Sequence, residues 1–365
     1  KVDYLPGWGV LEGVRELLQN ARDAETEFHA PMTVRMRAAL RKGEMGTLVI
    51  ENDGCTMPYE ALLLGHSTKS ERGDLIGKFG EGFKLGILAL LRSGHSVKIR
   101  NGSEVWQPEI VWSERLQARV LAFDIQKRRK EDTRIAIEVG GITPEFFREK
   151  IEPRFRWLSK ELVPALQVKT DYGTLLLGEA HKGHVFVKGI LVEIQPELAV
   201  GYDLDDADVD RDRRMVSSYD FEWKARTIWQ YALAMRPDLF DDYTAILDAN
   251  GPEAKGIEGY NAGRLPKDFV QHVTDAFRAK YGEDAVPVSN LGESQELEHF
   301  GRRGIVVNSA MRAVLESQMG TLETVQESLR NEVIRTYGWH ELSGEQRANL
   351  NRAVRLVNLG SPVDM

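Results

Sequence analysis

Hydrophobic and polar positions follow two different rhythms along the first 140 residues. Apolar residues recur at helical intervals over 10–26, while Thr47–Glu51 is an apolar run of strand length. A glycine-dense segment, 73–86, then leads into the apolar helix Leu85–Leu91. The strand pattern returns four times after it, at 97–100, 104–106, 120–125 and 135–139. Helices on one side of an antiparallel sheet are the arrangement we expect, which is an α+β sandwich.

The pattern changes from residue 143 onward, where a helical connector reaching residue 162 is expected. Beyond it, strands are expected at 173–177, 185–194 and 304–308, and a helix at 218–235. A turn at Lys188-Gly189 breaks the second of these strands. The pattern therefore predicts a first domain at 1–145, a helical connector at 146–162, a second domain at 163–320 and a helical tail at 321–365.

The composition is typical of a soluble globular chain of two or three domains, with 42% hydrophobic and 28% charged residues among 365. Neither a membrane-spanning stretch nor a secretory signal is found, so we expect no membrane partner and a cytoplasmic location, or a nuclear one in a eukaryote. The single cysteine, Cys55, excludes an internal disulfide and a multi-cysteine zinc site. A net charge of −8 argues against a dedicated nucleic-acid coat but leaves room for a local basic patch. Because the chain begins at Lys1, we expect a trimmed chain or a fragment.

The first predicted helix has one polar row. At about 100° per residue, Glu16, Asn20 and Asp23 lie along one side of it. A carboxylate can deprotonate a water, and a carboxamide one turn away can ligate Mg²⁺. Taken alone, however, such a row is more often a solvated helix face. The opposite, apolar side carries Val14, Leu18 and Ala21.

Two more motifs follow. Asn52-Asp53-Gly54 leaves a strand in a tight turn. The segment from Gly77 to Lys84 contains three glycines and runs into a helix, so its backbone N–H groups can approach an anion. It fits neither the dinucleotide fingerprint nor the P-loop.

In this order and spacing the motifs resemble the GHKL or Bergerat-fold ATPases, the superfamily of gyrase, the heat-shock chaperone, histidine kinases and MutL. Ser67-Thr68-Lys69 before the glycines and Lys84 after them are most similar to the microrchidia ATPases, and less closely to MutL. The resemblance covers roughly residues 10–140. It rests on Glu16-x-x-x-Asn20-Ala21-x-Asp23-Ala24, Asn52-Asp53-Gly54-Cys55-Thr56-Met57, Ile76-Gly77-Lys78-Phe79-Gly80-Glu81-Gly82-Phe83-Lys84 and the late strand Asp132–Ile137.

The resemblance implies a role for each matching residue. Glu16 would be the general base for hydrolysis, Asn20 would hold Mg²⁺, and Lys69 and Lys84 would compensate phosphate charge. Backbone N–H groups of residues 80–83 would bind the phosphates. The implied ATP site consists of Asn20, Asp23, Asn52, Asp53, Gly54, Met57, Thr68, Lys69, Gly77, Gly80, Glu81, Gly82, Phe83, Lys84 and Thr133.

One residue departs from the family pattern. Asn52 stands where the family has an adenine-reading aspartate, and Thr56 stands for its second glycine. The amide oxygen of Asn52 can accept a hydrogen bond, but without charge, which would cost about 1 kcal/mol, or roughly fivefold in affinity. A shift of one residue would instead bring Asp53 to the base. The preference for adenine is therefore left open.

The branches with gyrase, MutL and microrchidia imply an S5-like transducer over 163–320 that supplies a basic residue to the γ-phosphate. Its candidates are Lys182, Lys188, Arg211 and Arg213. The resemblance implies a slow, Mg²⁺-dependent ATPase that forms a homodimer with ATP, residues 1–9 crossing to the partner, and drives a DNA- or protein-directed process. A catalytically weak nucleotide-binding regulator and a chaperone-like ATPase acting on protein clients are the alternatives.

Three other clusters have simpler interpretations. The alternating aspartates from Asp206 to Asp212 fail as a calcium loop, because Arg211 stands where glycine is needed, so a solvated loop is expected. His181 and His184 lack an acidic or cysteine partner in a zinc spacing. The basic run Lys127–Lys130 is expected at an exposed hairpin tip.

Overall fold

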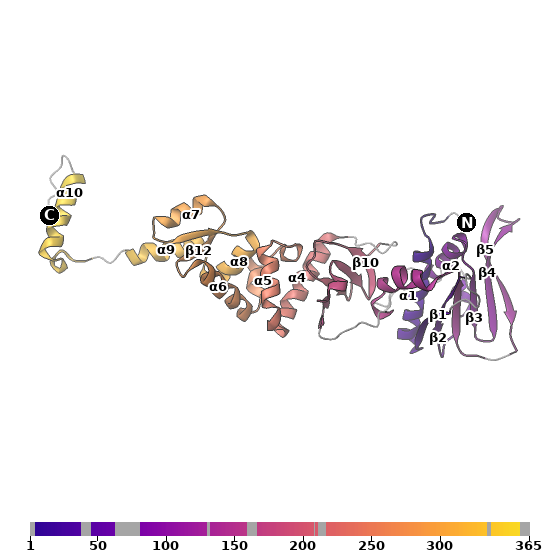
Figure 1. Ribbon diagram of the computed structural model, residues 1–365. Helices are drawn as coiled ribbons and strands as arrows, with labels where there is room; N and C mark the ends of the chain where they lie inside the picture. The colour runs from indigo at the N-terminus through magenta and orange to yellow at the C-terminus, as the bar shows by residue number, and fades with distance from the viewer. Residues whose placement is uncertain are drawn as a thin grey trace. The chain divides into compact units, whose positions relative to one another are not determined.

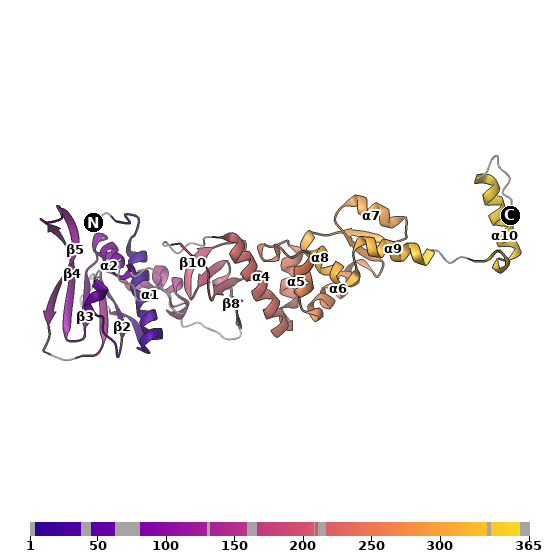
Figure 2. The ribbon, with the colours of Figure 1, turned by 180° about the vertical axis from the view of Figure 1, so that it is seen from behind.

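The computed structural model describes residues 4–37, 45–62, 81–129, 132–158, 166–207, 209–210, 217–333 and 337–357. The chain forms two compact units, Lys1–Pro196 with Val200–Ser217, and Glu197–Ala199 with Ser218–Met365 (Figures 1 and 2). The first unit holds the two larger sheets, and the second is mainly helical. Among the described residues, no helix combines the length and the apolar character that crossing a bilayer requires.

A six-stranded sheet, in which every neighbouring pair is antiparallel, begins the first unit. Two helices, α1 (Val10–Phe28) and α2 (Gly82–Arg92), pack on one face of it (Figure 1). The predicted α+β class is confirmed. In spatial order the strands are β1 (Met32–Arg37), β2 (Thr47–Asn52), β6 (Ile135–Gly140), β3 (Val97–Asn101), β4 (Glu104–Ser113) and β5 (Ala118–Lys127).

Two features of this sheet differ from the prediction. The edge strand β1 was not expected, because its side chains alternate only between half-buried and exposed and include two arginines. The basic run that begins at Lys127 is not a hairpin tip. It follows the edge strand β5, and the chain then crosses to β6, which lies between β2 and β3.

The core between helices and sheet explains how α1 is held. Val14, Leu17 and Leu18 are fully buried and belong to one cluster with side chains of β2, β3, β4 and β6. Burying a side chain of this size contributes roughly 1.5–3 kcal/mol. The apolar face of α1 is thus fixed on the sheet, which sets the direction of its polar row.

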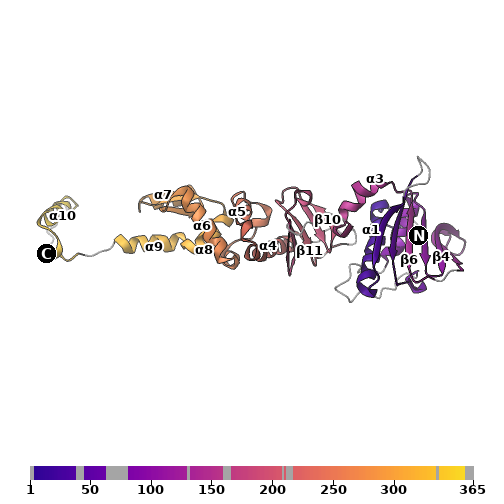
Figure 3. The ribbon, with the colours of Figure 1, turned by 60° about the horizontal axis from the view of Figure 1, so that its bottom comes forward.

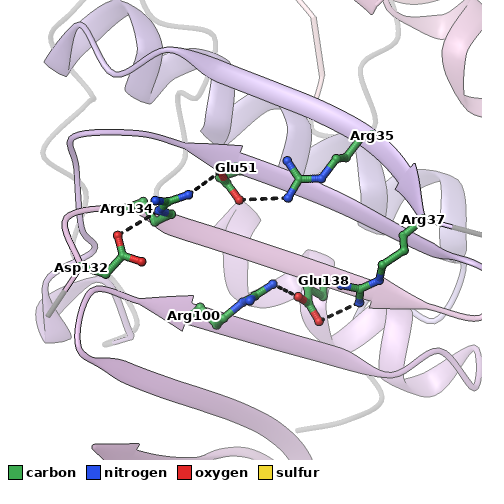
Figure 4. Close-up of polar contacts among 7 residues, drawn as sticks. All are labelled: Arg35, Arg37, Glu51, Arg100, Asp132, Arg134 and Glu138. Carbon is green, nitrogen blue, oxygen red and sulfur yellow. Dashed lines mark hydrogen bonds and ion pairs between the residues drawn. The ribbon is translucent and has the colours of Figure 1, made fainter. Parts of the chain in front are cut away.

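The other face of the sheet carries a network of ion pairs (Figure 4). Glu51 accepts hydrogen bonds from Arg35 at 3.3 Å and from Arg134 at 3.2 Å. Glu138 is likewise bridged by two guanidinium groups, those of Arg37 and Arg100. These pairs join β1, β2, β3 and β6 across the strands, so this face is stabilised by its own charges.

The connector after β6 is a series of short helical turns. It comprises α3 (Pro144–Phe146), a π-helical turn (Phe147–Ile151) and two 3₁₀ turns (Glu152–Arg154 and Arg156–Leu158). Pro153 has no backbone N–H and interrupts a regular helix here. Figure 3 shows α3 between the first sheet and the second.

The second sheet of this unit has the order β10-β9-β11-β8-β7. The predicted turn at Lys188-Gly189 is confirmed. Both residues have positive φ, 51° and 75°, as a two-residue hairpin loop requires. The strands β7 and β11 were not expected. The strand bounds are β7 (Gln167–Thr170), β8 (Gly173–Leu176), β9 (His184–Val187), β10 (Ile190–Ile194) and β11 (Gly201–Leu204).

The second unit packs helices around buried aromatic residues. Trp229 stacks on Tyr243 with ring centroids 4.6 Å apart, and Phe269 contacts Tyr243 in turn. The predicted helix Ser218–Met235 is confirmed as α4. The other elements are α5 (Phe240–Asp248), α6 (Lys267–Tyr281), β12 (Ala285–Val288), α7 (Leu291–Glu298), β13 (Arg303–Val306), α8 (Ser309–Met319), α9 (Leu322–Val333) and α10 (Gly344–Val357), with β12 and β13 parallel.

Candidate functional site

The polar row of α1 is not a solvated face. The exposed fraction is 6% for Glu16 and 1% for Asp23, and Asn20 is half-buried. Burying polar groups costs free energy unless they gain partners or serve a function. The structure therefore excludes the simpler interpretation of this row and leaves it as the centre of a candidate site.

Glu16 is held on both sides. Its Oε1 accepts hydrogen bonds from Nε and Nη2 of Arg15, at 3.2 and 3.1 Å. The guanidinium of Arg15 in turn lies over the ring of Trp8, 5.2 Å from its centroid. The other carboxylate oxygen faces α2, because a β-carbon on Gly82 would lie only 2.1 Å from Oε2. Glycine at 82 is thus required for Glu16 to reach the start of α2.

Two glycines let α1 and α2 cross closely enough for this contact. A β-carbon on Gly13 would lie 2.9 Å from the carbonyl oxygen of Gly86, and one on Gly86 would lie 2.9 Å from that of Gly13. Such backbone approach is possible only without side chains. The crossing brings the first turn of α2, with Gly82 and Phe83, beside Glu16.

The first turn of α2 suits an anion. Among the described residues no side chain caps it. The first four N–H groups of a helix have no partner within the helix, and the helix dipole places partial positive charge there. Glu81 occupies the N-cap position of this turn, and Gly82, Phe83 and Lys84 begin it. The family resemblance implies phosphate binding by the N–H groups of residues 80–83 and charge compensation by Lys84.

Asn52, at the end of β2, has a fixed orientation. Its Nδ2 donates to the carbonyl oxygens of Ala21 and Ala30, at 2.9 and 3.0 Å, and the residue is 2% exposed. Two acceptors at one side-chain atom identify that atom as the amide nitrogen. Within the described residues Oδ1 accepts no hydrogen bond, so it can serve a ligand. An aspartate here would lose both donor bonds, so the loss of affinity expected from asparagine is not the whole effect of this residue.

The turn after Asn52 is held by a residue that the sequence did not single out. Asn101 accepts from the backbone N–H of Met57 at 2.7 Å and donates to its carbonyl at 2.8 Å. Asn101 is followed by Gly102, a pair typical of a hairpin turn. The sequence therefore indicates only a turn here and not the hydrogen bonds to Met57. Asp53 and Gly54 are exposed, and Gly54 has a φ of 86°.

Thr133 is exposed and lies just before β6, two residues ahead of Ile135, which is paired with Asn52. The late strand therefore begins beside the acidic turn. The backbone register, not a side-chain contact, associates Thr133 with the site.

Lys84 is buried beside this site. Its Nζ donates to the carbonyl oxygen of Ala61 at 3.1 Å. Burial lowers the pKa of the Lys84 ammonium, and the charge of Glu81 opposes this shift. A buried cation whose charged form is disfavoured gains from an incoming anion.

Cys55, a free and half-buried thiol, lies in the same turn. Burial raises the pKa of its thiol, and the charge of Asp53 raises it further. The thiol is therefore less reactive than an exposed cysteine at neutral pH.

Asn20 fits the single-ligand role expected for Mg²⁺. Its Nδ2 donates to the carbonyl oxygen of Glu16 at 2.6 Å, and Oδ1 has no hydrogen bond within the described residues. Mg²⁺ takes few protein ligands and keeps several waters. The described residues contain no cluster of three or more histidine, cysteine, aspartate or glutamate side chains arranged for a metal. His181 and His184 are therefore not part of such a cluster among these residues.

Six of the predicted residues lie outside the described residues: Thr68, Lys69, Gly77, Gly80, Arg211 and Arg213. Of the two basic candidates in the second sheet, Lys182 precedes β9 and Lys188 follows it, so they lie at opposite ends of the strand. The turn with Lys188 contacts the connector, since Arg156 donates its backbone N–H to the carbonyl of Gly189 at 2.9 Å.

No protein-family model matches this chain, and no curated protein does either. The chain is similar to the ATPase region of Saccharomyces cerevisiae topoisomerase II, with 14% identity and a TM-score of 0.31 over 49% of this chain and 61% of that one. The same region bound to ICRF-187 gives 12% identity and a TM-score of 0.29, over 50% and 62%. The match thus spans about three fifths of those regions. A similarity this low carries no argument about function.

Proposed function

We propose that this chain binds and slowly hydrolyses ATP as a conformational switch of the GHKL type. One observation carries the proposal. The carboxylate of Glu16 is buried against the first turn of α2, and Asn20 follows it one helical turn later. A phosphate bound by N–H groups of that turn would lie next to this carboxylate, which is the placing that a general base requires.

Each residue then has a task. Glu16 orients a water and takes its proton at Oε2, while Arg15 holds Oε1. Asn20 would hold Mg²⁺, which neutralises phosphate charge when bound. The N–H groups of residues 81–83 and the ammonium of Lys84 bind phosphate oxygens. Oδ1 of Asn52 accepts from the exocyclic amino group of adenine, and Thr133 lines the pocket.

The domain assignment belongs to the same proposal. Residues 1–145 form the ATPase domain, 146–162 the connector, 163–320 an S5-like transducer and 321–365 a helical tail. Lys188 is the transducer residue that we favour for the γ-phosphate, because its turn contacts the connector through Arg156. The described parts of this assignment remain compatible with either a DNA-directed or a protein-directed output.

Dimerisation with ATP is the remaining element of the proposed switch. Residues 4–9 pack against α2 of the same chain, where Arg92 donates to the carbonyl oxygens of Leu5 and Trp8, at 2.8 and 2.6 Å. If the N-terminal segment crosses to a partner, it must first release these bonds. ATP-dependent mass by light scattering, with and without residues 1–9, tests this part.

One observation favours a second candidate, a nucleotide-binding regulator of weak activity. Arg15 pairs with Oε1 of Glu16, and in this second class the pair would neutralise the carboxylate instead of orienting it as a base. A chaperone-like ATPase uses the same site on protein clients. Turnover distinguishes the regulator from the ATPases. A regulator binds ATP with little hydrolysis, whereas an ATPase binds and hydrolyses it, whether it acts on DNA or on a protein client.

The single cysteine offers a test of nucleotide binding. Cys55 lies three residues beyond Asn52, so a nucleotide on Oδ1 of Asn52 should shield it. We expect Mg²⁺-ATP to slow labelling of Cys55 by a disulfide reagent at least severalfold, and GTP to slow it less. If excess Mg²⁺-ATP leaves the labelling rate of Cys55 unchanged and gives no measurable heat of binding, the proposal is contradicted.

A further inference from the structure

A cavity lies beside Arg15, and Glu16 is not among the residues that line it. Its volume is about 410 Å³, and it is lined by residues 5–8, 11, 12 and 15, by Arg154 and Phe155, and by Ile190, Leu191 and Val192. Sites for small molecules typically enclose 300–1,000 Å³. The cavity is therefore large enough for a small organic ligand.

The walls of this cavity combine apolar surface with positive charge. Leu11 and Trp8 form one apolar side, and Ile190 and Leu191 form the other. Two guanidinium groups line it, against one carboxylate, that of Glu12. The Oε2 of Glu12 already accepts the backbone N–H of Gly9 at 2.9 Å, as part of the start of α1. An anion with an apolar body is the ligand that this lining complements.

Arg154 provides the accessible cation. It is exposed, and its Nε donates to the carbonyl of Lys150 at 3.1 Å. Its two Nη atoms have no partner within the described residues. They can pair with a carboxylate or sulfonate at the mouth of the cavity without breaking an existing contact.

Arg15 couples this cavity to the candidate active site. Its guanidinium lines the cavity, stacks on Trp8 and holds Oε1 of Glu16. An anion in the cavity competes with Glu16 for this guanidinium. The opposite wall is β10, which begins directly after the Lys188-Gly189 turn. A ligand here touches both the helix that carries Glu16 and the hairpin that carries Lys188.

We propose that this cavity binds a small organic anion with an apolar body, and that its occupation slows hydrolysis by drawing Arg15 away from Glu16. The binding stands on the cavity itself, whereas the effect on rate rests on the proposed ATPase function. Arg15 acts here as a positioning residue, because it touches Glu16 and not the nucleotide.

Binding is tested without ATP by two dyes with one aromatic skeleton. 8-Anilinonaphthalene-1-sulfonate carries the anion, and N-phenyl-1-naphthylamine lacks it. We expect one site for the sulfonate and at least tenfold weaker binding of the neutral dye. Arg154→Gln, at an exposed position that the fold does not need, should remove most of this difference. Equal affinity for the two dyes, or an unchanged preference in Arg154→Gln, would overturn the anion site.

A matched pair of tryptophan substitutions tests the location. Leu191→Trp should fill the cavity and weaken binding of both dyes at least tenfold, provided that circular dichroism shows a folded chain. Leu116→Trp adds the same side chain at an exposed turn between β4 and β5 and should change nothing. Unchanged dye binding in a folded Leu191→Trp chain would place the dye elsewhere and reject the cavity.

The coupling is tested by turnover. The sulfonate dye should lower kcat about tenfold in the wild type while the affinity for a non-hydrolysable ATP analogue stays within twofold. Arg15→Gln should have a low kcat that the dye no longer changes, and Arg15→Lys should restore part of it. Dye binding without a change in kcat would reject the coupling alone. A chain that shows no ATP turnover would refute the proposed function and leave the dye result standing.

Discussion

Two polar surfaces of the first unit look alike in the sequence and differ in the structure. The row on α1 places Glu16 and Asp23 in the interior, with exposed fractions of 6% and 1%. The network on the open face of the first sheet keeps its arginines about half exposed, and each of its two glutamates is bridged by two guanidinium groups (Figure 4). The first surface is buried at a cost to stability, and the second neutralises itself in water.

The difference predicts which polar residues serve chemistry. Exposed ion pairs contribute little to stability, typically about 0–1 kcal/mol, and are easily lost. A buried carboxylate costs far more, so a chain that keeps one at a helix start gains something else from it. We therefore expect substitutions in the α1 row to change activity and those on the open face to change little.

The largest effect is expected from Glu16→Gln. The amide keeps the shape of the side chain but cannot take a proton, so hydrolysis should fall about 10²–10⁴-fold. Binding of a non-hydrolysable ATP analogue should stay within a few-fold, since Glu16 acts on water. Glu109→Gln, the same change at an exposed position on β4, is the control and should leave turnover unchanged. Turnover of Glu16→Gln at the wild-type rate would exclude Glu16 as the base.

Asn52→Asp should lower stability. The substitution removes the donor to Ala21 and Ala30 and places a carboxylate against two carbonyl oxygens. Each buried hydrogen bond lost without replacement costs about 1–3 kcal/mol, so the free energy of unfolding should fall by roughly 2–4 kcal/mol. Urea unfolding with circular dichroism measures this. Tighter ATP binding at unchanged stability would contradict this structural role and show that Asn52 only binds adenine, more weakly than an aspartate would.

Lys84→Met should weaken ATP binding about tenfold or more, because a charge-assisted hydrogen bond is worth about 1.5–3 kcal/mol. The same change removes a buried cation, so the stability of the free protein should not fall. Calorimetry on the pure proteins gives the affinity. If Lys84→Met binds ATP as tightly as the wild type, Lys84 does not bind phosphate.

The pH dependence follows from the same residue. Burial lowers the pKa of Lys84 below its usual value of 10.5, and a bound polyphosphate would raise it again. Between these two pKa values the complex holds more protons than the free protein. Affinity should therefore fall as the pH rises through that alkaline interval, with proton uptake on binding. Lys84→Met should abolish this slope, which titrations in two buffers of different ionisation heat can detect.

Much of the first unit could be predicted, because its strands are apolar and its motifs are ordered. The helix that carries the polar row was predicted, but the burial of the row depends on α2, and α2 approaches only because Gly13 and Gly86 allow it. No local pattern contains that long-range contact. Chain order also concealed the position of β6, which pairs with β2 and β3 and not with β5.

The contacts that support the candidate site could not be predicted from the sequence. Asn101 resembles half of a hairpin turn, and its clamp on Met57 joins positions 44 apart in sequence. Asn52 was identified by a family pattern, but only the structure shows that its amide nitrogen is committed to Ala21 and Ala30. Supporting contacts of this kind follow from packing, which the sequence does not show directly.

The smallest effect is expected on the open face, from Glu138→Gln. Removing this carboxylate leaves Arg37 and Arg100 facing each other. Burial already lowers the pKa of Arg100, and the charges of Arg128 and Arg37 lower it further, while the charge of Glu51 opposes the shift. Because the arginines remain largely in contact with water, the free energy of unfolding should fall by less than about 1 kcal/mol, and ATP turnover should not change.

The loss of stability in Glu138→Gln should shrink further in about 1 M salt, where charges more than roughly 3 Å apart are screened. Glu51→Gln provides a second case with the same geometry. A loss above about 2 kcal/mol, or a fall in turnover like that of Glu16→Gln, would mean that the open face is part of the working site and that the contrast between the two surfaces fails.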